Sequence, residues 1–282
     1  MGRPEAMVRA AEQLQQVFEI PDHRIDLGEA TLVLAQLEYP NLNVGRYVEV
    51  LDEFARDAAS RLVGRYDPDR TIEQLNHFLF TELGFRGNEL DYYDPRNSFL
   101  NDVIDRRTGI PITLAVVYLE ITRRLGLPFY GVGLPGHFLI KYDDNRKVTY
   151  LDPFQGGRIL DREKCQDLVR SLKGDDVSLT AHDFRAVDNR HIVTRMLNNL
   201  RSIYLTTRRY RKAIGVMDMI LSLLPASPEE VKQRAWLHYE MRHLSRARQD
   251  LETYLSLRSD AEDAESVIEW IKEIRQSLAR MN

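Results

Sequence analysis

Apolar residues at helical spacing dominate the first third of the chain. They recur three to four residues apart in four segments, and each stripe is expected to face a core. The four predicted helices carry these apolar positions: Ala10, Ala11, Leu14, Val17 and Phe18; Leu27, Ala30, Leu34 and Leu37; Tyr47, Val48, Leu51, Phe54, Ala55, Ala58 and Leu62; Leu75, Phe78 and Leu79. Residues 1–95 are therefore predicted to be helical, apart from a loop at residues 84–95 that is punctuated by Gly, Asn and Pro.

The next segment predicts two helices of different character. Asn97 and Ser98 are suitable N-caps for a short amphipathic helix that Gly109 would end. Pro111 then suits the first turn of a second helix, which Gly126 closes. Apolar side chains cover nearly every side of this second helix, so we expect it to be buried.

Short extended runs follow at residues 129–134, 137–142 and 147–152, and residues 143–146 are turn formers. These runs predict an antiparallel hairpin in which His137 faces Asp152, while Phe138, Ile140 and Leu151 face the core. Directly opposed residues have Cβ atoms roughly 4.5 to 5.5 Å apart, close enough for a hydrogen bond between imidazole and carboxylate. A short strand at residues 158–160 and an amphipathic helix around Cys165 complete a predicted α+β core at residues 96–188.

The opposed His137 and Asp152 are the first candidate site residues. A carboxylate beside an imidazole fixes the imidazole tautomer and raises its basicity, which is the orienting role found in nucleophilic triads. The alternative is a structural pair at the ends of two strands. A nucleophile would be best placed at the start of the buried helix, where the helix dipole stabilises a thiolate, yet no cysteine lies there.

Other polar residues near the helix starts are candidates for supporting roles. The hydroxyl of Thr113 is a speculative nucleophile, although threonine needs special activation. Asn97 and Arg107 are candidates for polar support. The only cysteine, Cys165, is predicted on a separate helix.

The chain resembles the SirB1 family in the run NSFLNDVIDRRTGIPITLAVVYLEITRRLG, followed by LPGHFLIKY and YLDPFQGG. Members of that family join a transglutaminase-like core to tetratricopeptide repeats. The resemblance implies a cysteine at the head of the buried helix, a histidine that opens one strand and an aspartate that ends the next. His137 and Asp152 match the second and third positions, whereas the cysteine position falls at about Pro111. The resemblance therefore implies a transglutaminase-like fold that has lost its chemistry.

From about His191 the chain reads as helix pairs with a 34-residue echo, the length of a tetratricopeptide repeat. Leu244 echoes Tyr210 and Ala247 echoes Ala213. A final apolar helix would cap the array with Val267, Ile268, Trp270, Ile271, Ile274 and Leu278. We therefore predict two domains, 1–188 and 189–282. The concave face of the repeats would hold a protein or peptide partner, and its candidate lining residues are Arg195, Asn198, Asn199, Arg201 and Arg234.

Composition narrows the class of protein. The 282 residues are 43% hydrophobic and 29% charged, with a formal net charge of −4, which disfavours a general nucleic-acid or anionic-membrane surface. A single cysteine excludes an internal disulfide framework and fits a reducing cytoplasm. The N-terminus lacks an apolar signal core, and the longest apolar run is too short to cross a bilayer. We expect a cytoplasmic protein with no cofactor, no metal site and no membrane span.

Three functions are compatible with this sequence. The leading hypothesis is a non-catalytic transglutaminase-like protein that acts as an interaction or regulatory adaptor through its repeats. The second is a hydrolase or acyl transferase in which His137, oriented by Asp152, acts as general base on water or on Thr113. The third is a peptide or small-ligand binding module that keeps the shape of the old site.

Overall fold

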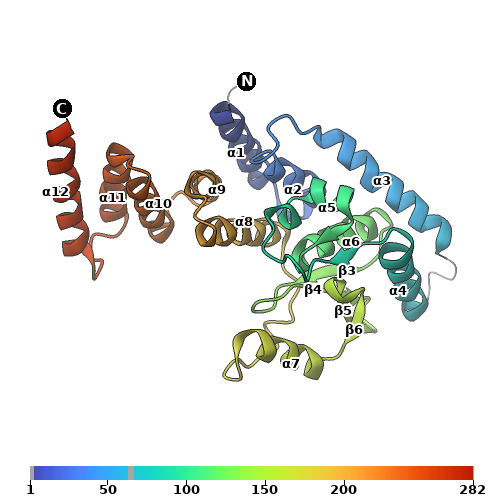
Figure 1. Cartoon of the computed structure of the whole chain (residues 1–282). Coiled ribbons are helices and arrows are strands. Elements are labelled where there is room, and N and C mark those ends of the chain that lie inside the picture. The colour runs from blue at the N-terminus through green and yellow to red at the C-terminus, as the bar shows by residue number, and fades with distance from the viewer. Residues whose placement is uncertain (1–2, 63–66, 282) are drawn as a thin grey trace. The chain divides into compact units, whose positions relative to one another are not determined.

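The computed structural model describes residues 3–62 and 67–281. The predicted helical region 1–95 thus includes two stretches, 1–2 and 63–66, that lie outside the described residues. The chain divides into two compact units, one from Val17 to Met196 and one from Leu197 onward together with the residues up to Gln16 (Figure 1). Helices α1 (Arg3–Glu19) and α8 (Asn189–Thr206) each cross a limit between units. The predicted domain limits at 188 and 189 stay a prediction.

The first helices of the larger unit follow the predicted stripes. They are α2 (Leu27–Ala35), α3 (Val44–Arg61) and α4 (Pro68–Asn76), which continues as a π-helical turn, η2 (His77–Glu82). A short 3-10 turn, η1 (Asp22–Arg24), precedes α2. Asp26, Asn43 and Asp67 cap α2, α3 and α4, because each side chain accepts a backbone N–H of the first turn.

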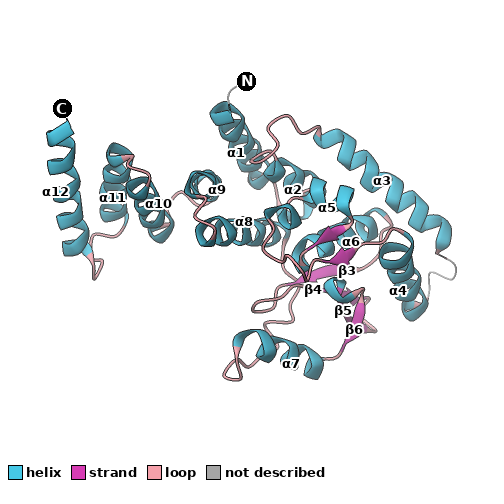
Figure 2. Ribbon diagram, in the orientation of Figure 1, coloured by secondary structure: helices cyan, strands magenta, loops and turns pink. Residues whose placement is uncertain are grey.

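A four-stranded antiparallel sheet forms the centre of the larger unit (Figure 2). Its strands in order are β3 (Phe129–Val132), β4 (Leu139–Asp143), β5 (Val148–Asp152) and β6 (Arg158–Leu160). The structure therefore confirms the predicted strand at residues 158–160 and the α+β class. A second, parallel ladder joins β1 (Arg86–Gly87) to β2 (Thr108–Gly109) inside segments predicted as loop and helix end. Two-residue strands have no alternation to detect, which is why the sequence did not predict them.

Helix α6 (Pro111–Arg124) is the predicted buried helix, and every residue from Pro111 to Thr122 is buried. It packs against α2, α3 and α5 (Leu100–Arg106) and against strands β3 and β4. One of its buried residues is charged: Glu120 forms ion pairs with Arg123 and Arg124. The helix ends as predicted, with Gly126 in the left-handed region at φ 66°.

The predicted ends of the preceding helix are wrong. Asn97 and Ser98 lie in a 3-10 turn, η3 (Pro95–Ser98), which Asp94 caps, so α5 starts one residue later with Phe99 as its N-cap. Its C-terminal left-handed residue is Arg107, at φ 55°, instead of Gly109. The guanidinium of Arg107 lies 4.6 Å from the Phe54 ring centroid and donates a hydrogen bond of 2.5 Å to the Ile104 carbonyl. These contacts offset the cost of about 1 to 2 kcal/mol of a left-handed non-glycine residue.

The opposite side of the sheet is covered by α7 (Arg162–Lys173), the predicted amphipathic helix of Cys165. Asp161 caps this helix by accepting the N–H of Lys164 at 2.8 Å. Cys165 and Val169 on the helix join a hydrophobic cluster with Tyr150 of the sheet and Phe184 of the following loop. Cys165 is thus part of a core.

The smaller unit consists of helix pairs whose backbone repeats every 34 residues. Its helices are α9 (Tyr210–Leu223), α10 (Pro228–Glu240), α11 (Leu244–Leu257) and α12 (Ala264–Met281). Both ends of α9 and α11 are 34 residues apart, and so are the left-handed residues Arg208 (φ 53°) and Arg242 (φ 59°) that precede them. This confirms the predicted repeat length. Val267, Ile271 and Ile274 of α12 complete the core, whereas Ile268 is exposed.

Candidate functional site

A tight turn places His137 at the entrance to β4. The residues Leu134, Pro135, Gly136 and His137 form a β-turn in which the His137 N–H donates to the Leu134 carbonyl at 3.2 Å. Gly136 has a φ of 76°, and a proline followed by a left-handed glycine is the signature of a type II turn. The turn holds the backbone of His137 before the strand begins.

Asp152, the last residue of β5, divides its carboxylate between two contacts. Its Oδ1 accepts the backbone N–H of Phe154 at 2.9 Å and thereby caps a 3-10 turn, η4 (Pro153–Gln155). Its Oδ2 lies 3.0 Å from Nε2 of His137. The carbonyl of Asp152 also accepts the N–H of Gly157 at 2.8 Å. The carboxylate is therefore fixed by local backbone before it meets the imidazole.

The predicted hairpin register is wrong by one pair. Tyr142 pairs with Thr149 and Asp143 with Val148, so the four-residue loop is 144–147 instead of 143–146. Asp144 causes the difference, because its Oδ1 accepts the N–H groups of Arg146 and Lys147 at 2.9 and 2.7 Å and so closes the turn one residue later. The observed register places Asp152 across from Leu139, and His137 lies diagonally across the pair. Diagonal neighbours remain within reach of a ring side chain.

The His137–Asp152 pair is almost fully enclosed. The relative exposed areas of the two residues are 7% and 2%, and the ring of Phe154 stands perpendicular to the imidazole with centroids 6.4 Å apart. Despite its proximity to Oδ2, Nε2 of His137 has no aligned hydrogen bond within the described part of the chain. The arrangement can hold a proton between base and carboxylate, but the imidazole is not presented to solvent.

Arg195 is a site residue that sequence reasoning placed elsewhere. We predicted it on the concave face of the repeats, but its Nη2 donates 2.6 Å hydrogen bonds to the carbonyls of Leu134 and His137. Burial lowers the pKa of this guanidinium. Gly133 leaves room for it, since a Cβ there would lie 2.9 Å from Nη1 of Arg195. Arg195 therefore clamps the turn that carries His137.

The head of α6 holds the other predicted site residues in structural roles. Pro111 is the first residue of the helix and is buried. The Thr113 hydroxyl is fully buried, donates to the Asn97 carbonyl at 2.7 Å and accepts the N–H of Ile110 at 3.1 Å. Asn97 donates to the Asp91 carbonyl at 2.7 Å. These bonds join the helix head to the preceding loop.

Cys165 and Arg107 lie in other surroundings. Burial, together with the nearby carboxylates of Asp161 and Asp152, raises the pKa of the Cys165 thiol to about 11. A thiol of this kind is a poor nucleophile at neutral pH. Arg107 lies between the rings of Phe54 and Phe85, as described for the end of α5.

The smaller unit has a pocket of about 510 Å³, whose lining consists of Arg201, Glu229, Glu230, Lys232, Gln233, Trp236 and Trp270. Of the predicted concave-face residues, Arg201 contributes to this pocket. Arg234 instead binds Asp250 at 2.7 Å and Asp218 at 2.8 Å, which makes it an internal brace. The two tryptophans were not predicted as binding residues, although tryptophan is enriched in binding hot spots.

Two classes of site were searched for in residues 3–62 and 67–281. No cluster of three or more His, Cys, Asp and Glu side chains there could hold a metal ion. None of the helices in these ranges is long and apolar enough to span a membrane.

Comparison with known proteins agrees with this architecture. The profile of the transglutaminase-like superfamily matches residues 45–198, and a tetratricopeptide repeat profile matches residues 200–272. A UPF0162 protein of Xylella fastidiosa (strain 9a5c) is 37% identical over 241 residues, which cover 84% of this chain and 86% of that protein. F-box only protein 21 of Mus musculus is 28% identical over 183 residues, which cover 61% of this chain and 28% of that protein.

Among solved structures, a crystal structure of menin is similar with a TM-score of 0.43 and 9% identity, over 93% of this chain and 73% of that chain. The family profile covers more than half of this sequence and includes both His137 and Asp152. The chain therefore belongs to the transglutaminase-like superfamily and carries C-terminal tetratricopeptide repeats, as its resemblance to the SirB1 family implies.

Proposed function

We propose that this protein is a non-catalytic transglutaminase-like protein that acts in the cytoplasm as an interaction or regulatory adaptor through its helical repeats. The observation that carries the proposal is the head of α6. Pro111 occupies about the place where the resemblance puts the cysteine, and it is buried together with Ile110 and Ile112. A proline side chain has no nucleophilic atom, so thiol chemistry has no starting point there.

The surroundings of the His137–Asp152 pair support a structural role. The Asp152 carboxylate caps η4, and Arg195 binds the carbonyl of His137. The pair thus ties the entrance of β4 to the end of β5. A general base needs its reacting nitrogen within hydrogen-bond reach of a substrate proton, and here the imidazole is 7% exposed.

The tryptophan-lined pocket of the smaller unit supports the interaction role. Its charged lining residues are paired: Arg201 with Glu230, Lys232 with Asp263, and Glu229 with Arg258. The charges are thereby compensated, while Trp236 remains 38% exposed. This combination favours a segment of a protein partner that inserts an apolar side chain, because aromatic pockets surrounded by satisfied polar groups are typical anchor sites.

A direct test of lost catalysis compares the protein with its His137→Ala variant. The assays are hydrolysis of p-nitrophenyl acetate and incorporation of a fluorescent amine into casein. We expect both proteins to match the uncatalysed rate, and the matched Cys165→Ser variant to do the same. Turnover by the unaltered protein that His137→Ala abolishes, with the fold intact by circular dichroism, would refute the non-catalytic proposal.

The binding role can be tested with the chain's own fluorescence, because both of its tryptophans line the pocket. Ten-residue peptides with one aromatic or aliphatic anchor are titrated while tryptophan emission is recorded. We expect saturable changes, and a Trp236→Ala loss of affinity of about 30-fold, as for a hot-spot residue. Leu224→Ala, at another exposed position of the same unit, should change affinity less than about twofold. Equal losses for the two variants would contradict a pocket-specific site.

The enzyme hypothesis keeps one favourable observation, the 3.0 Å approach of His137 and Asp152. In that case water is the acceptor of choice, since the Thr113 hydroxyl is already engaged by Asn97 and Ile110. The esterase assay above separates it from the adaptor proposal.

A further inference from the structure

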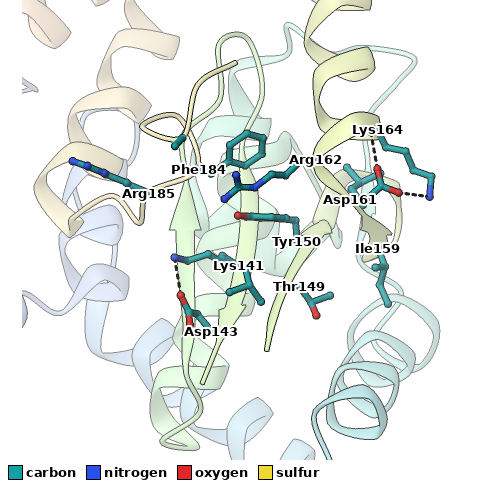
Figure 3. Close-up of a pocket in the computed structure, with 13 residues that line it drawn as sticks. Lys141, Asp143, Thr149, Tyr150, Ile159, Asp161, Arg162, Lys164, Phe184 and Arg185 are labelled. Carbon is teal, nitrogen blue, oxygen red and sulfur yellow. Dashed lines mark hydrogen bonds and ion pairs between the residues drawn. The ribbon is translucent and has the colours of Figure 1, made fainter. Parts of the chain in front are cut away.

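A second pocket, of about 680 Å³, lies in the larger unit over strands β4, β5 and β6 (Figure 3). Its floor is the ring of Tyr150, which packs against Phe184 with centroids 5.1 Å apart. Its walls come from the first turn of α7 and from the loop at residues 181–185. This volume lies within the usual range of small-molecule sites, roughly 300 to 1,000 Å³.

The pocket is a positively charged spot on an acidic chain. Four cationic side chains line it, against two carboxylates, whereas the whole chain has a formal net charge of −4. Lys141 pairs with Asp143 at 3.0 Å and Lys164 pairs with Asp161 at 2.9 Å. The remaining two cations are guanidinium groups, and within the described residues neither has a carboxylate partner. The lining therefore has two positive charges to spare.

One of these groups, Arg162, is held in place by an aromatic ring. Its Cζ lies 5.0 Å from the centroid of the Phe184 ring. In Figure 3 its side chain lies between the Phe184 and Tyr150 rings, whereas that of Arg185 extends away from them. Cation–π contact uses the face of a guanidinium and leaves its in-plane N–H donors available. Arg162 can thus offer a preorganised fork of donors.

Apolar surface lies beside these donors. Val148 and Ile159, which also line the pocket, are 50% and 53% exposed. A ligand that carries an oxyanion and a small apolar or aromatic body would satisfy both parts of the lining. A phosphate monoester has a charge near −2 at neutral pH, which matches the spare charge, and it accepts bidentate bonds from arginine.

We propose that this pocket binds a small organic phosphate monoester, with Arg162 as the bidentate donor, Lys141 and Lys164 as flanking charges, and Val148 and Ile159 against the organic part. The site is independent of the tryptophan pocket, because it contains neither tryptophan. It is equally independent of the His137–Asp152 pair.

Isothermal titration calorimetry on the full chain in Tris buffer tests the proposal, with phenyl phosphate as probe and phenol, benzoate and inorganic phosphate as comparators. We expect one saturable site for phenyl phosphate and weaker binding of each comparator. Arg162→Gln should weaken phenyl phosphate binding by about tenfold or more, since it removes a charge-assisted donor. Arg162→Lys keeps the charge but loses the fork, and it should also weaken binding.

Arg170→Gln is the matched control, because it removes an exposed arginine of the same helix that does not line the pocket. It should leave affinity within about twofold. Absence of saturable binding up to about 5 mM would overturn the proposal, as would equal losses in Arg170→Gln and Arg162→Gln. Benzoate binding as tight as phenyl phosphate would overturn the phosphate assignment, and equally tight phenol binding would overturn the role of charge.

Discussion

At the scale of single residues, Asp152 is the most constrained position of the candidate site. One carboxylate oxygen caps a 3-10 turn and the other lies against an imidazole, all at 2% exposure. Loss of such a carboxylate removes a cap and leaves a buried histidine nitrogen without its neighbour.

We therefore expect Asp152→Ala to lower the free energy of unfolding by about 2 to 3 kcal/mol, measured by urea denaturation. Asp152→Asn should cost less than about 1 kcal/mol, because its amide oxygen can still accept the Phe154 N–H. Equal stability of the alanine variant and the unaltered protein would argue against a structural pair.

A second residue-scale prediction concerns Cys165 and pH. Its pKa in the folded protein is raised to about 11, above the value near 9 of an exposed thiol. The unfolded state therefore loses its thiol proton first as pH rises. The contribution of Cys165 to stability is fully present below about pH 9 and is lost as pH rises through 11.

Iodoacetamide labelling followed by mass spectrometry checks this environment. At pH 8 in native buffer we expect almost no labelling of Cys165, and complete labelling in urea. Fast labelling of the native protein would place the thiol at an accessible position and revive it as a candidate nucleophile.

Much of the site was visible at this scale because its chemistry is local. His137 and Asp152 stand at strand ends that alternation alone predicts. Arg195 was missed, since it lies 58 residues beyond His137 in sequence and acts through backbone carbonyls, which leave no trace in a residue pattern. Asn97 and Thr113 were assigned chemistry because polar residues at helix starts look available, yet each is engaged by backbone groups.

At the scale of elements, helix α6 shows how a buried charge is accommodated. Glu120 is almost fully buried and forms ion pairs with Arg123 and Arg124, the second of which is only 12% exposed. Arg124 is also held by Asp52 of α3 at 2.6 Å. The carboxylate thus joins the end of the core helix to its neighbour.

Glu120→Ala should destabilise the protein by about 3 to 5 kcal/mol, because it leaves a largely buried guanidinium short of a partner. Glu120→Gln should cost less, since its amide oxygen can still accept. Glu49→Ala, at an exposed position of α3, should fall within about 0.5 kcal/mol in the same urea titration. A Glu120→Ala cost as small as that of Glu49→Ala would show that water replaces the ion pair.

The repeat helices give a further prediction at this scale. Ala213 and Ala247 are fully buried positions 34 residues apart. Ala247→Leu and Ala213→Leu should each destabilise the protein by about 1 to 3 kcal/mol through overpacking, as measured by urea denaturation. A neutral effect at both positions would contradict close helix packing at the small residues.

Element types were predictable because the apolar periods are long, whereas element ends depended on single side chains. Asp94 and Asp144 each redirected a boundary by accepting backbone N–H groups. Such competition among nearby caps cannot be resolved from apolar spacing.

At the scale of the whole molecule, the excess of acidic residues sets the kind of partner. A formal net charge of −4 does not attract a polyanion, and the basic pocket over the sheet is small beside a nucleic-acid footprint. Fluorescence anisotropy with a labelled single-stranded RNA should give a dissociation constant above about 100 µM at physiological salt. A tighter, salt-sensitive interaction would contradict the expected absence of nucleic-acid binding.

The matching backbone angles at Arg208 and Arg242 have a consequence for how this protein can change in length. Since the chain enters α9 and α11 through the same turn, a tandem duplication of 34 codons would add a whole helix pair without a new connection. Growth or shrinkage by that step should preserve the fold of the array, whereas any other increment would break it.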